Sequence, residues 1–515
     1  MKKVFFILII LLAFVLRFYK LGQVPPSISW DEAAVGYNAW TIIHWGKDEW
    51  GKTLPLVFKS FEDYKHPVHI YLTAPFIAAF GLTEFGVRSS SAFFGTLNVV
   101  VIFFLARKIF KSELAGCLAS FFLAVSPYNI HFSRFNHELN FALFFLMLGY
   151  YLILRGIDKK NYLIILGFAS LGIDLLTYHS AKIIAPPVTL LISVLYFKDL
   201  VKVKKYFLLG LMSFFFFVSL MFIQPELLGG ARLKQTSSPE ERTLQAVTEK
   251  YFKHFTYDYL FVTGDKNPRL SAQTGEFYKV DLVFLAVGIL VLLWGIIKGR
   301  KDNLIILAWA LLAPLPAAVT SETPHAARAM FMTGSWHLIA VLGALTIINL
   351  AKNKYLKIFM ISLIAIVLLL SLSKFLKYCF GEYARRYAID WQYGMKDVVN
   401  YVKDNPNYYK VYMDKIRQQP YIFYLFYLKT PLPELLRTVK YEESEARSYN
   451  TVRSFGKYQF GGWDPIESYP GYGIVYVITP SYYSGLRFGH RFNLDKLIKY
   501  PNGNDAFYIV SGDEQ

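Results

Sequence analysis

Apolar runs and polar loops alternate along most of the chain, a pattern typical of a protein that crosses a membrane many times. Several runs are long enough, or nearly so, to cross roughly 30 Å of hydrocarbon, among them residues 282–297, 304–319 and 358–372. The first run, residues 4–18, follows two lysines as in a signal peptide, but the large side chains after it make a poor cleavage site. We therefore predict that this run is retained as the first span.

The loops are of two kinds, and their charges predict the topology. Short basic loops, for example around Arg107 and Lys108 or at residues 298–301, belong in the cytoplasm by the positive-inside rule. The longer, mixed loops are residues 21–86, 126–136, 177–182, 224–279 and 320–328. About eleven spans connect the two sets, so the N-terminus is predicted to be cytoplasmic and everything after residue 376 to lie outside.

Residues 66–80 test this scheme because they look like a short additional span. If this segment crossed, Arg107 and Lys108 would lie outside and every later basic loop would invert with them. The segment is only about 15 residues long, which is below the usual spanning length. We predict a juxtamembrane or re-entrant helix at the outer surface.

The chain after residue 376 has a different pattern. Helical periodicity occurs at residues 391–403, a second helix is predicted at 421–428, and strand-like alternation occurs at 410–413, 473–479 and 505–510. The predicted fold is therefore a polytopic α-helical membrane domain over residues 1–375, followed by an extracytoplasmic α/β domain over residues 376–515.

The composition agrees with a membrane protein and limits the partners and cofactors to be expected. The chain is 54% hydrophobic, more than a soluble protein can hide without exposing apolar patches. A net charge of +18 would suit nucleic-acid binding, but the basic loops account for most of it, so membrane lipids and no nucleic acid are expected as partners. The two cysteines carry no zinc or disulfide spacing. No cofactor is certain from the sequence, and a divalent metal ion is the one candidate.

The richest polar cluster, residues 29–37, follows the first span. A helix beginning here would place Asp31 near its N-terminus, where the helix dipole favours an ionised carboxylate that can accept a proton from an incoming hydroxyl. Ser29 and Glu32 fit a capping box, so Glu32 is explained equally well as a group that satisfies backbone donors. Asp31 is not needed for the cap, which favours a functional role.

Basic side chains stand at the start of the predicted surface helix and of a later span. Lys65 and His66 could hold a lipid phosphate at headgroup depth, although interfacial anchoring explains them as well. Arg328, three residues after His325, enters a span and could simply extend to the interface.

A short outer loop carries Arg134 and Glu138. Their spacing of four also fits an ordinary helical ion pair. The sequence contains no P-loop, dinucleotide-binding fingerprint, HExxH site or nucleophile elbow. Because the ionisable clusters lie in the outer loops, where nucleotide-activated donors are absent, the pattern favours a donor carried across the membrane on a lipid.

The order of these motifs resembles the membrane glycosyltransferases of the GT-C fold. The closest groups are the dolichyl-phosphate-mannose protein mannosyltransferases and the lipid A aminoarabinose transferase, and the resemblance covers roughly residues 1–350. The segments that carry it are Asp31-Glu32, Lys65-His66-Pro67, residues 81–88, Ser133-Arg134 with Glu138, and Pro324-His325 with Arg328.

The resemblance implies inverting transfer of a sugar from a polyprenyl-phosphate carrier. It would make Asp31 the catalytic carboxylate, with Lys65 and His66 beside the donor phosphate and Glu138 as a second acidic residue. The aminoarabinose transferase has an arginine three residues after its aspartate, where this chain has Ala34. Part of the phosphate site must then come from elsewhere, for which the candidates are Arg134, His325 and Arg328.

We therefore expect a glycosyltransferase of the inner (plasma) membrane. It would move a hexosyl or pentosyl group to a protein, lipid or glycan acceptor on the outer face. A transporter is the first alternative, but it would need interrupted helices in matching halves, and no two-fold pattern is seen. A non-catalytic sensor with an outer domain is the second, but it would not need ionisable clusters on several outer loops.

Overall fold

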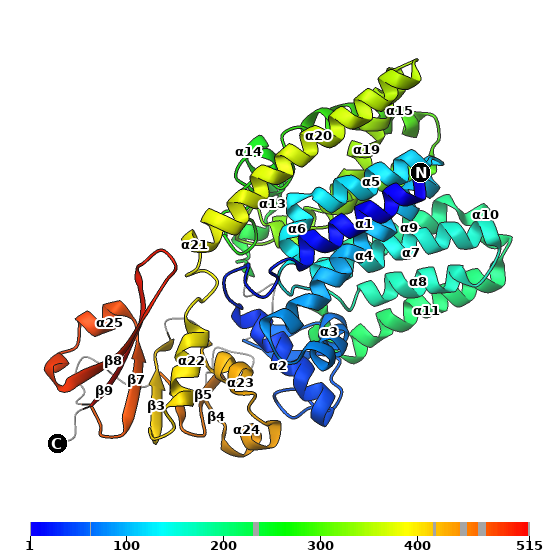
Figure 1. The fold of residues 1–515 in the computed structure, drawn as a ribbon. Coiled ribbons are helices and arrows are strands. Elements are labelled where there is room, and N and C mark those ends of the chain that lie inside the picture. Colours follow the sequence, from blue (N-terminus) through cyan, green and yellow to red (C-terminus); the bar gives the residue numbers. More distant parts are fainter. Residues whose placement is uncertain are drawn as a thin grey trace. The chain divides into compact units, whose positions relative to one another are not determined.

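In a computed structural model, residues 2–61, 63–229, 236–415, 419–442, 451–461 and 470–512 are described (Figure 1). The chain divides into two compact units, and each is described by itself. The helical unit comprises Met1–Tyr19, His66–His69 and Ser91–Cys379. The α/β unit comprises Lys20–Lys65, Ile70–Ser90 and Phe380–Gln515.

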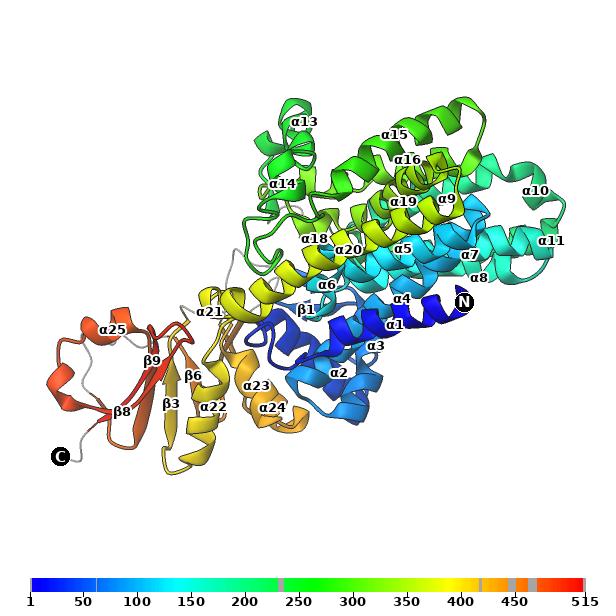
Figure 2. The same ribbon diagram turned by 45° about the horizontal axis from the view of Figure 1, so that its top comes forward.

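The helical unit is built from apolar helices joined by short connections. Helix α8 packs between α7 and α11, α15 packs against α19, and α1 packs against α5 (Figures 1 and 2). The helices are α1 Lys2–Phe18, α4 Glu84–Phe110, α5 Glu113–Val125, α6 Pro127–Ser133, α7 Leu139–Lys159, α8 Leu163–Asp174, α9 Ala181–Leu195, α10 Phe197–Val201, α11 Lys204–Ile223, α13 Leu244–Lys253, α14 Tyr257–Phe261, α15 Asp281–Ile297, α16 Lys301–Leu312, α17 Leu315–Ala318, α18 Ala326–Ala329, α19 Met332–Leu350 and α20 Lys354–Tyr378. The first seven residues of α4 belong to the α/β unit.

The helices confirm a multi-pass membrane protein. Six helical segments of the described chain are long and apolar enough to cross a membrane, and α5 with α6, bent by 60°, could form a seventh span. Eleven spans stay a prediction, because that number also needs the shorter helices α1, α8, α9 and α15 to cross. Helix α3, Pro67–Phe80, has 14 residues and is too short for this set, and its placement at the outer surface also stays a prediction.

The α/β unit contains a seven-stranded mixed sheet in the order β4-β5-β6-β3-β7-β9-β8. The central strand β3 is parallel to β6 and β7, and the other neighbours are antiparallel. The strands are β3 Lys410–Met413, β4 Lys440–Glu442, β5 Thr451–Phe455, β6 Tyr458–Phe460, β7 Ile474–Ile478, β8 Phe492–Lys499 and β9 Asp505–Gly512. The helices are α2 Trp30–Trp45, α21 Ala384–Arg386, α22 Met395–Asp404, α23 Tyr421–Leu428, α24 Leu432–Thr438 and α25 Pro480–Ser484. The predicted strands at 410–413, 473–479 and 505–510 and the helix at 421–428 are all present.

Residues 20–65 pack with the C-terminal residues in this unit, and the domain boundary at residue 376 stays a prediction. Helix α2 lies against α23, and the Tyr37 hydroxyl donates to the Thr430 carbonyl at 2.8 Å. Gly36 permits the close approach, since a Cβ there would lie 2.5 Å from Val87 and 2.8 Å from Phe426. Such packing joins residues hundreds of positions apart, so local periodicity cannot reveal it.

Candidate functional site

The predicted capping box is confirmed at the start of α2. The Ser29 hydroxyl accepts from the Glu32 backbone N–H at 3.3 Å, and the Glu32 carboxylate accepts from the Ser29 backbone N–H at 3.0 Å. The cap satisfies two of the backbone donors that a helix leaves open at its N-terminus. It therefore fixes the residue at which α2 begins, and with it the direction of Asp31.

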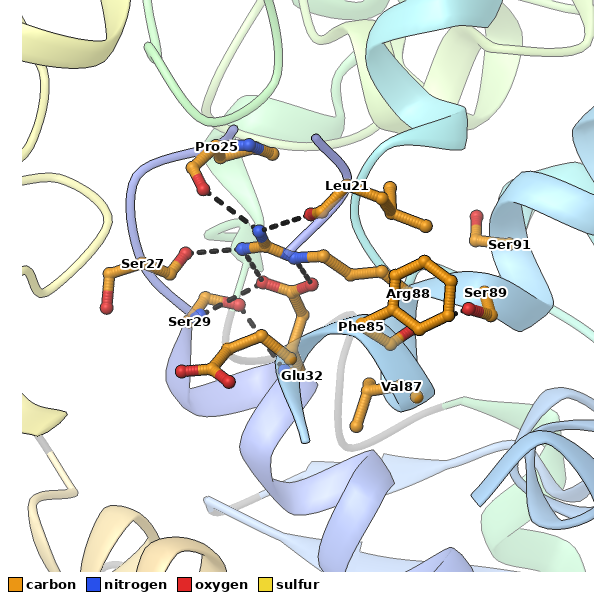
Figure 3. Close-up of polar contacts among 12 residues, drawn as sticks. Leu21, Pro25, Ser27, Ser29, Glu32, Phe85, Val87, Arg88, Ser89 and Ser91 are labelled. Atoms are coloured by element: carbon orange, nitrogen blue, oxygen red, sulfur yellow. Dashed lines mark hydrogen bonds and ion pairs between the residues drawn. The ribbon is translucent and has the colours of Figure 1, made fainter. Parts of the chain in front are cut away.

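The carboxylate of Glu32 also forms a buried ion pair with Arg88 of α4 (Figure 3). Arg88 Nε donates to Glu32 Oε1 at 2.9 Å and Nη2 donates to Oε2 at 3.2 Å, and both side chains are fully buried. The same guanidinium donates to the carbonyls of Leu21, Pro25 and Ser27. Glu32 thus holds the loop, the helix start and α4 together, while a catalytic role for it stays a prediction.

Asp31 has a more open environment although it is the adjacent residue. Its side chain is 44% exposed and forms an ion pair with Lys65, whose side chain is 12% exposed. Lys65 ends strand β2, Asp63–Lys65, which pairs antiparallel with β1, Phe58–Ser60. The sequence placed Lys65 at a helix start, but α3 begins two residues later, and the hairpin holds Lys65 opposite Phe58.

Glu138, in the helical unit, lies between two histidines. His137 Nδ1 is 2.9 Å from Glu138 Oε2, and His69 Nε2 is 3.6 Å from Oε1. His69 is fully buried, whereas the Glu138 side chain is 14% exposed. The predicted second acidic residue therefore belongs to a histidine-rich cluster near the N-terminus of α7.

His66 joins the same cluster from the start of α3. Its ring meets the His179 ring edge-on at a centroid distance of 4.3 Å. Lys182 Nζ lies 3.4 Å from His179 Nδ1 and donates to the Leu227 carbonyl. Burial lowers the pKa of His66 well below its ordinary value, and Lys182 and His179 lower it further, so His66 is a neutral imidazole near neutral pH.

Arg134 contacts the C-terminal end of α1. Its guanidinium donates to the carbonyls of Leu16 at 2.9 Å, Tyr19 at 2.8 Å and Arg17 at 3.4 Å, and the residue is 4% exposed. The Leu16 and Arg17 carbonyls are among those that an α-helix leaves without an internal partner, and Tyr19 directly follows the helix. Arg134 thus has a structural task, and its predicted role at a phosphate stays a prediction.

The segment that carries Arg328 is held in place by the preceding long loop. Arg328 is half-buried and its Nη1 donates to the Thr320 hydroxyl at 2.8 Å, while His325 Nδ1 accepts from the Arg328 backbone N–H at 3.3 Å. His254 Nε2 accepts from the His325 backbone N–H at 3.1 Å. Burial lowers the pKa of His254 to about 4, which keeps this nitrogen free of a proton and able to accept.

An acidic residue fixes the next backbone position of that segment. Asp265 Oδ2 accepts from the Ala326 N–H at 2.7 Å, and burial raises the pKa of Asp265 to about 6. The structure therefore holds Arg328 through His325 and Ala326, which precede it in the chain.

Sequence reasoning assigned no role to Arg88, His69, His137 or His179. Arg88 alone had a readable signal, because an arginine at the start of an apolar helix requires a partner. Among the described residues, no three His, Cys, Asp or Glu side chains are arranged to hold a metal ion.

Comparison with known proteins shows the family resemblance. Residues 64–222 match the model of the family described as dolichyl-phosphate-mannose-protein mannosyltransferase. No curated protein sequence matches the chain.

Solved structures match over a much larger part of the chain. ArnT from Cupriavidus metallidurans in the apo state is 15% identical, with a TM-score of 0.57 and 99% of each chain covered. The same protein bound to undecaprenyl phosphate gives 13% identity, a TM-score of 0.55 and 99% of each chain covered. The archaeal oligosaccharyltransferase AglB from Archaeoglobus fulgidus, in complex with an inhibitory peptide and a dolichol-phosphate, gives 13% identity and a TM-score of 0.50, with 83% of this chain and 63% of that chain covered. The chain therefore has the GT-C fold of the glycosyltransferases that its sequence resembles.

Proposed function

We propose that this protein is a membrane glycosyltransferase that takes a sugar from a polyprenyl-phosphate carrier. The fold is shared with proteins whose structures hold undecaprenyl phosphate or a dolichol-phosphate, and the matching family acts on dolichyl-phosphate-mannose. Transfer takes place on the outer face of the inner membrane, because the basic loops assign the ionisable loops to that side. The acceptor is a protein, lipid or glycan that offers a hydroxyl or amine.

The observation that carries this proposal is the Asp31–Lys65 ion pair, next to the buried Glu32–Arg88 ion pair. Asp31 occupies the first turn of α2 and is nearly half exposed, so a substrate can reach its carboxylate. Lys65 neutralises Asp31 in the resting protein and offers three donor hydrogens to an arriving phosphate. The buried Glu32–Arg88 pair keeps the helix start in place while these partners exchange.

The reaction is an inverting displacement at the anomeric carbon. The acceptor oxygen or nitrogen forms a bond to that carbon on the face opposite the phosphate, and its proton passes to Asp31. The bond between the anomeric carbon and the phosphate oxygen breaks, and its electron pair leaves with the polyprenyl phosphate. Lys65 stabilises the negative charge that develops there, and Arg328 is proposed as a second cation.

A lipid-release assay tests the proposal. Purified protein in lipid nanodiscs is mixed with undecaprenyl phosphate carrying labelled mannose, glucose or aminoarabinose, with and without a membrane extract as the acceptor source. We expect acceptor-dependent release of undecaprenyl phosphate from one of these donors, and its loss in Asp31→Asn. If the wild-type protein forms no labelled product with any of the donors, the proposal fails.

A further inference from the structure

Three outer-loop segments of the helical unit bring six polar side chains together, which we call the Glu138 cluster. Helix α3 contributes at its start, the loop before α7 contributes next, and the connection from α8 to α9 completes the group. The Val68 N–H donates to the Leu176 carbonyl at 3.4 Å and ties the first and third segments. The members are His66, His69, His137, Glu138, His179 and Lys182.

The cluster contains a negatively and a positively charged side chain. Glu138 supplies one negative charge and Lys182 one positive charge, while His66 is neutral for the reasons given above. A phosphate would meet the Glu138 carboxylate at close range, and like charges repel strongly where water is largely excluded. A ligand without net charge fits the cluster better than an anion does.

His66 has an unused hydrogen-bonding atom. It is 1% exposed, and its Nε2 has no hydrogen-bond partner among the residues that the structure describes. Burying such a nitrogen without a partner costs free energy. A ligand hydroxyl would offset that cost, because a hydroxyl can both donate and accept.

The Glu138 cluster offers both hydrogen-bond donors and acceptors, and this mixture selects the class of ligand. Glu138 and neutral imidazole nitrogens accept hydrogen bonds, whereas Lys182 and imidazole N–H groups donate them. Sugar hydroxyls satisfy both kinds of group, and their bonds to a carboxylate are charge-assisted. Lys65, the proposed phosphate ligand, directly precedes His66 in the chain.

We propose that the Glu138 cluster binds the hydroxyl groups of the donor's sugar and so selects which sugar is transferred. This inference rests on the proposed function, and it assigns His66 to the sugar where the sequence suggested the phosphate. Glu138, His66 and His179 are specificity-determining residues in this scheme, and Asp31 remains the base.

Paired binding measurements separate the sugar from the phosphate. The affinities of undecaprenyl phosphate and of the sugar lipid that supports turnover are measured in nanodiscs for the wild type, His66→Gln, His179→Gln and Glu138→Gln. His490→Gln is the matched control, since His490 is exposed in the α/β unit. Each cluster variant should bind the sugar lipid about tenfold more weakly, as expected for one lost hydrogen bond, and should bind undecaprenyl phosphate as the wild type does.

Retained binding of undecaprenyl phosphate also shows that a variant is folded. If His66→Gln does not fold, His179→Gln still tests the inference, because His179 is only half-buried. Equal loss of both ligands would assign the cluster to the phosphate, and loss of neither would leave it outside the donor site. Either result overturns this inference while the proposed function stands. A wild-type protein that binds undecaprenyl phosphate and turns over no sugar lipid would refute the proposed function itself.

Discussion

Two consecutive carboxylates at the start of α2 form ion pairs in opposite environments. Glu32 and Arg88 are fully buried and the arginine makes five hydrogen bonds, whereas Asp31 is 44% exposed and its pair with Lys65 is reachable. If the Glu32 carboxylate left its partner, the Arg88 guanidinium would remain as an uncompensated buried charge. An open pair can exchange one partner for a substrate at little cost.

The difference shows how one helix turn can contain both support and reactivity. Adjacent residues on a helix point about 100° apart, so one carboxylate faces the interior while the next faces the solvent. The burial of Glu32 is therefore part of what makes Asp31 usable. Four substitutions test the difference between buried and exposed carboxyl groups, and they follow in order of decreasing effect.

Glu32→Gln should have the largest effect, and it should act on stability. The amide retains the cap but leaves Arg88 charged and buried, so we expect a loss of about 3 kcal/mol in the free energy of unfolding. Thermal and denaturant unfolding in detergent measures it. In a double-mutant cycle, Arg88→Met should cost less in the Glu32→Gln background than in the wild type. The folded fraction should still turn over donor, and a folded but inactive Glu32→Gln would place Glu32 in the chemistry.

Asp31→Asn should slow turnover roughly 100-fold or more, the usual scale for loss of a general base. The amide preserves size and hydrogen bonding but cannot take the acceptor's proton. Stability should change by no more than about 0.5 kcal/mol, because the side chain is half exposed. Turnover near the wild-type rate would remove Asp31 as the base, and Glu138 would become the candidate.

Lys65→Ala should weaken donor binding and slow the departure of the phosphate, because one cation is lost from the site. The two effects together should lower kcat/KM by about tenfold. Lys59→Ala is the matched control, since Lys59 lies on the paired strand β1 with its Nζ 5.6 Å from the Trp50 ring centroid. The control should change donor affinity by less than about twofold. Identical donor affinities and rates in Lys65→Ala and the wild type would remove Lys65 from the site.

Glu49 extends the comparison to a buried carboxyl without an arginine. Glu49 is 4% exposed, and the Tyr421 hydroxyl lies 3.5 Å from its Oε2. Burial, and to a smaller extent the nearby Asp48, raises the pKa of Glu49 from 4.5 to about 8, although Asn38 and Lys65 act to lower it. The folded state thus retains a proton that the unfolded state loses, so stability falls as pH rises from 4.5 to 8.

Glu49→Gln removes this pH dependence. Relative to the wild type, its unfolding free energy should rise by about 1 kcal/mol between pH 7 and pH 8 and then level off. Unfolding curves at pH 7, 8 and 9 provide the test. A difference that stays constant over this range would show that Glu49 is already ionised at pH 7.

The features readable from the sequence were those with a local cause. The capping box needs only Ser29 and Glu32, three residues apart, and the helix at 421–428 needs only its own apolar run. The GT-C fold was also predicted, because the order of the loop motifs and the charge alternation extend over most of the helical part of the chain.

Contacts between distant segments could not be read in this way. Arg88 reaches Glu32 across 56 positions, and His69 meets Glu138 only after the chain has folded back. Arg134 and Glu138 looked like a helical pair, but a helix ends at Ser133 and the next begins at Leu139, so the spacing of four has no helical meaning there. Arg134 turns instead to the carbonyls of α1.

The capping box places a strict limit on how this loop can evolve. Surface loops ordinarily tolerate insertions and deletions, and residues 46–57, after α2, should do so. One residue added between Ser29 and Glu32 would instead break the cap, and a new helix start would rotate the following side chains by about 100°. The two carboxylates would then change environments, with Asp31 turned from the solvent. Natural variants of this chain should therefore vary in length after α2 rather than across these four positions.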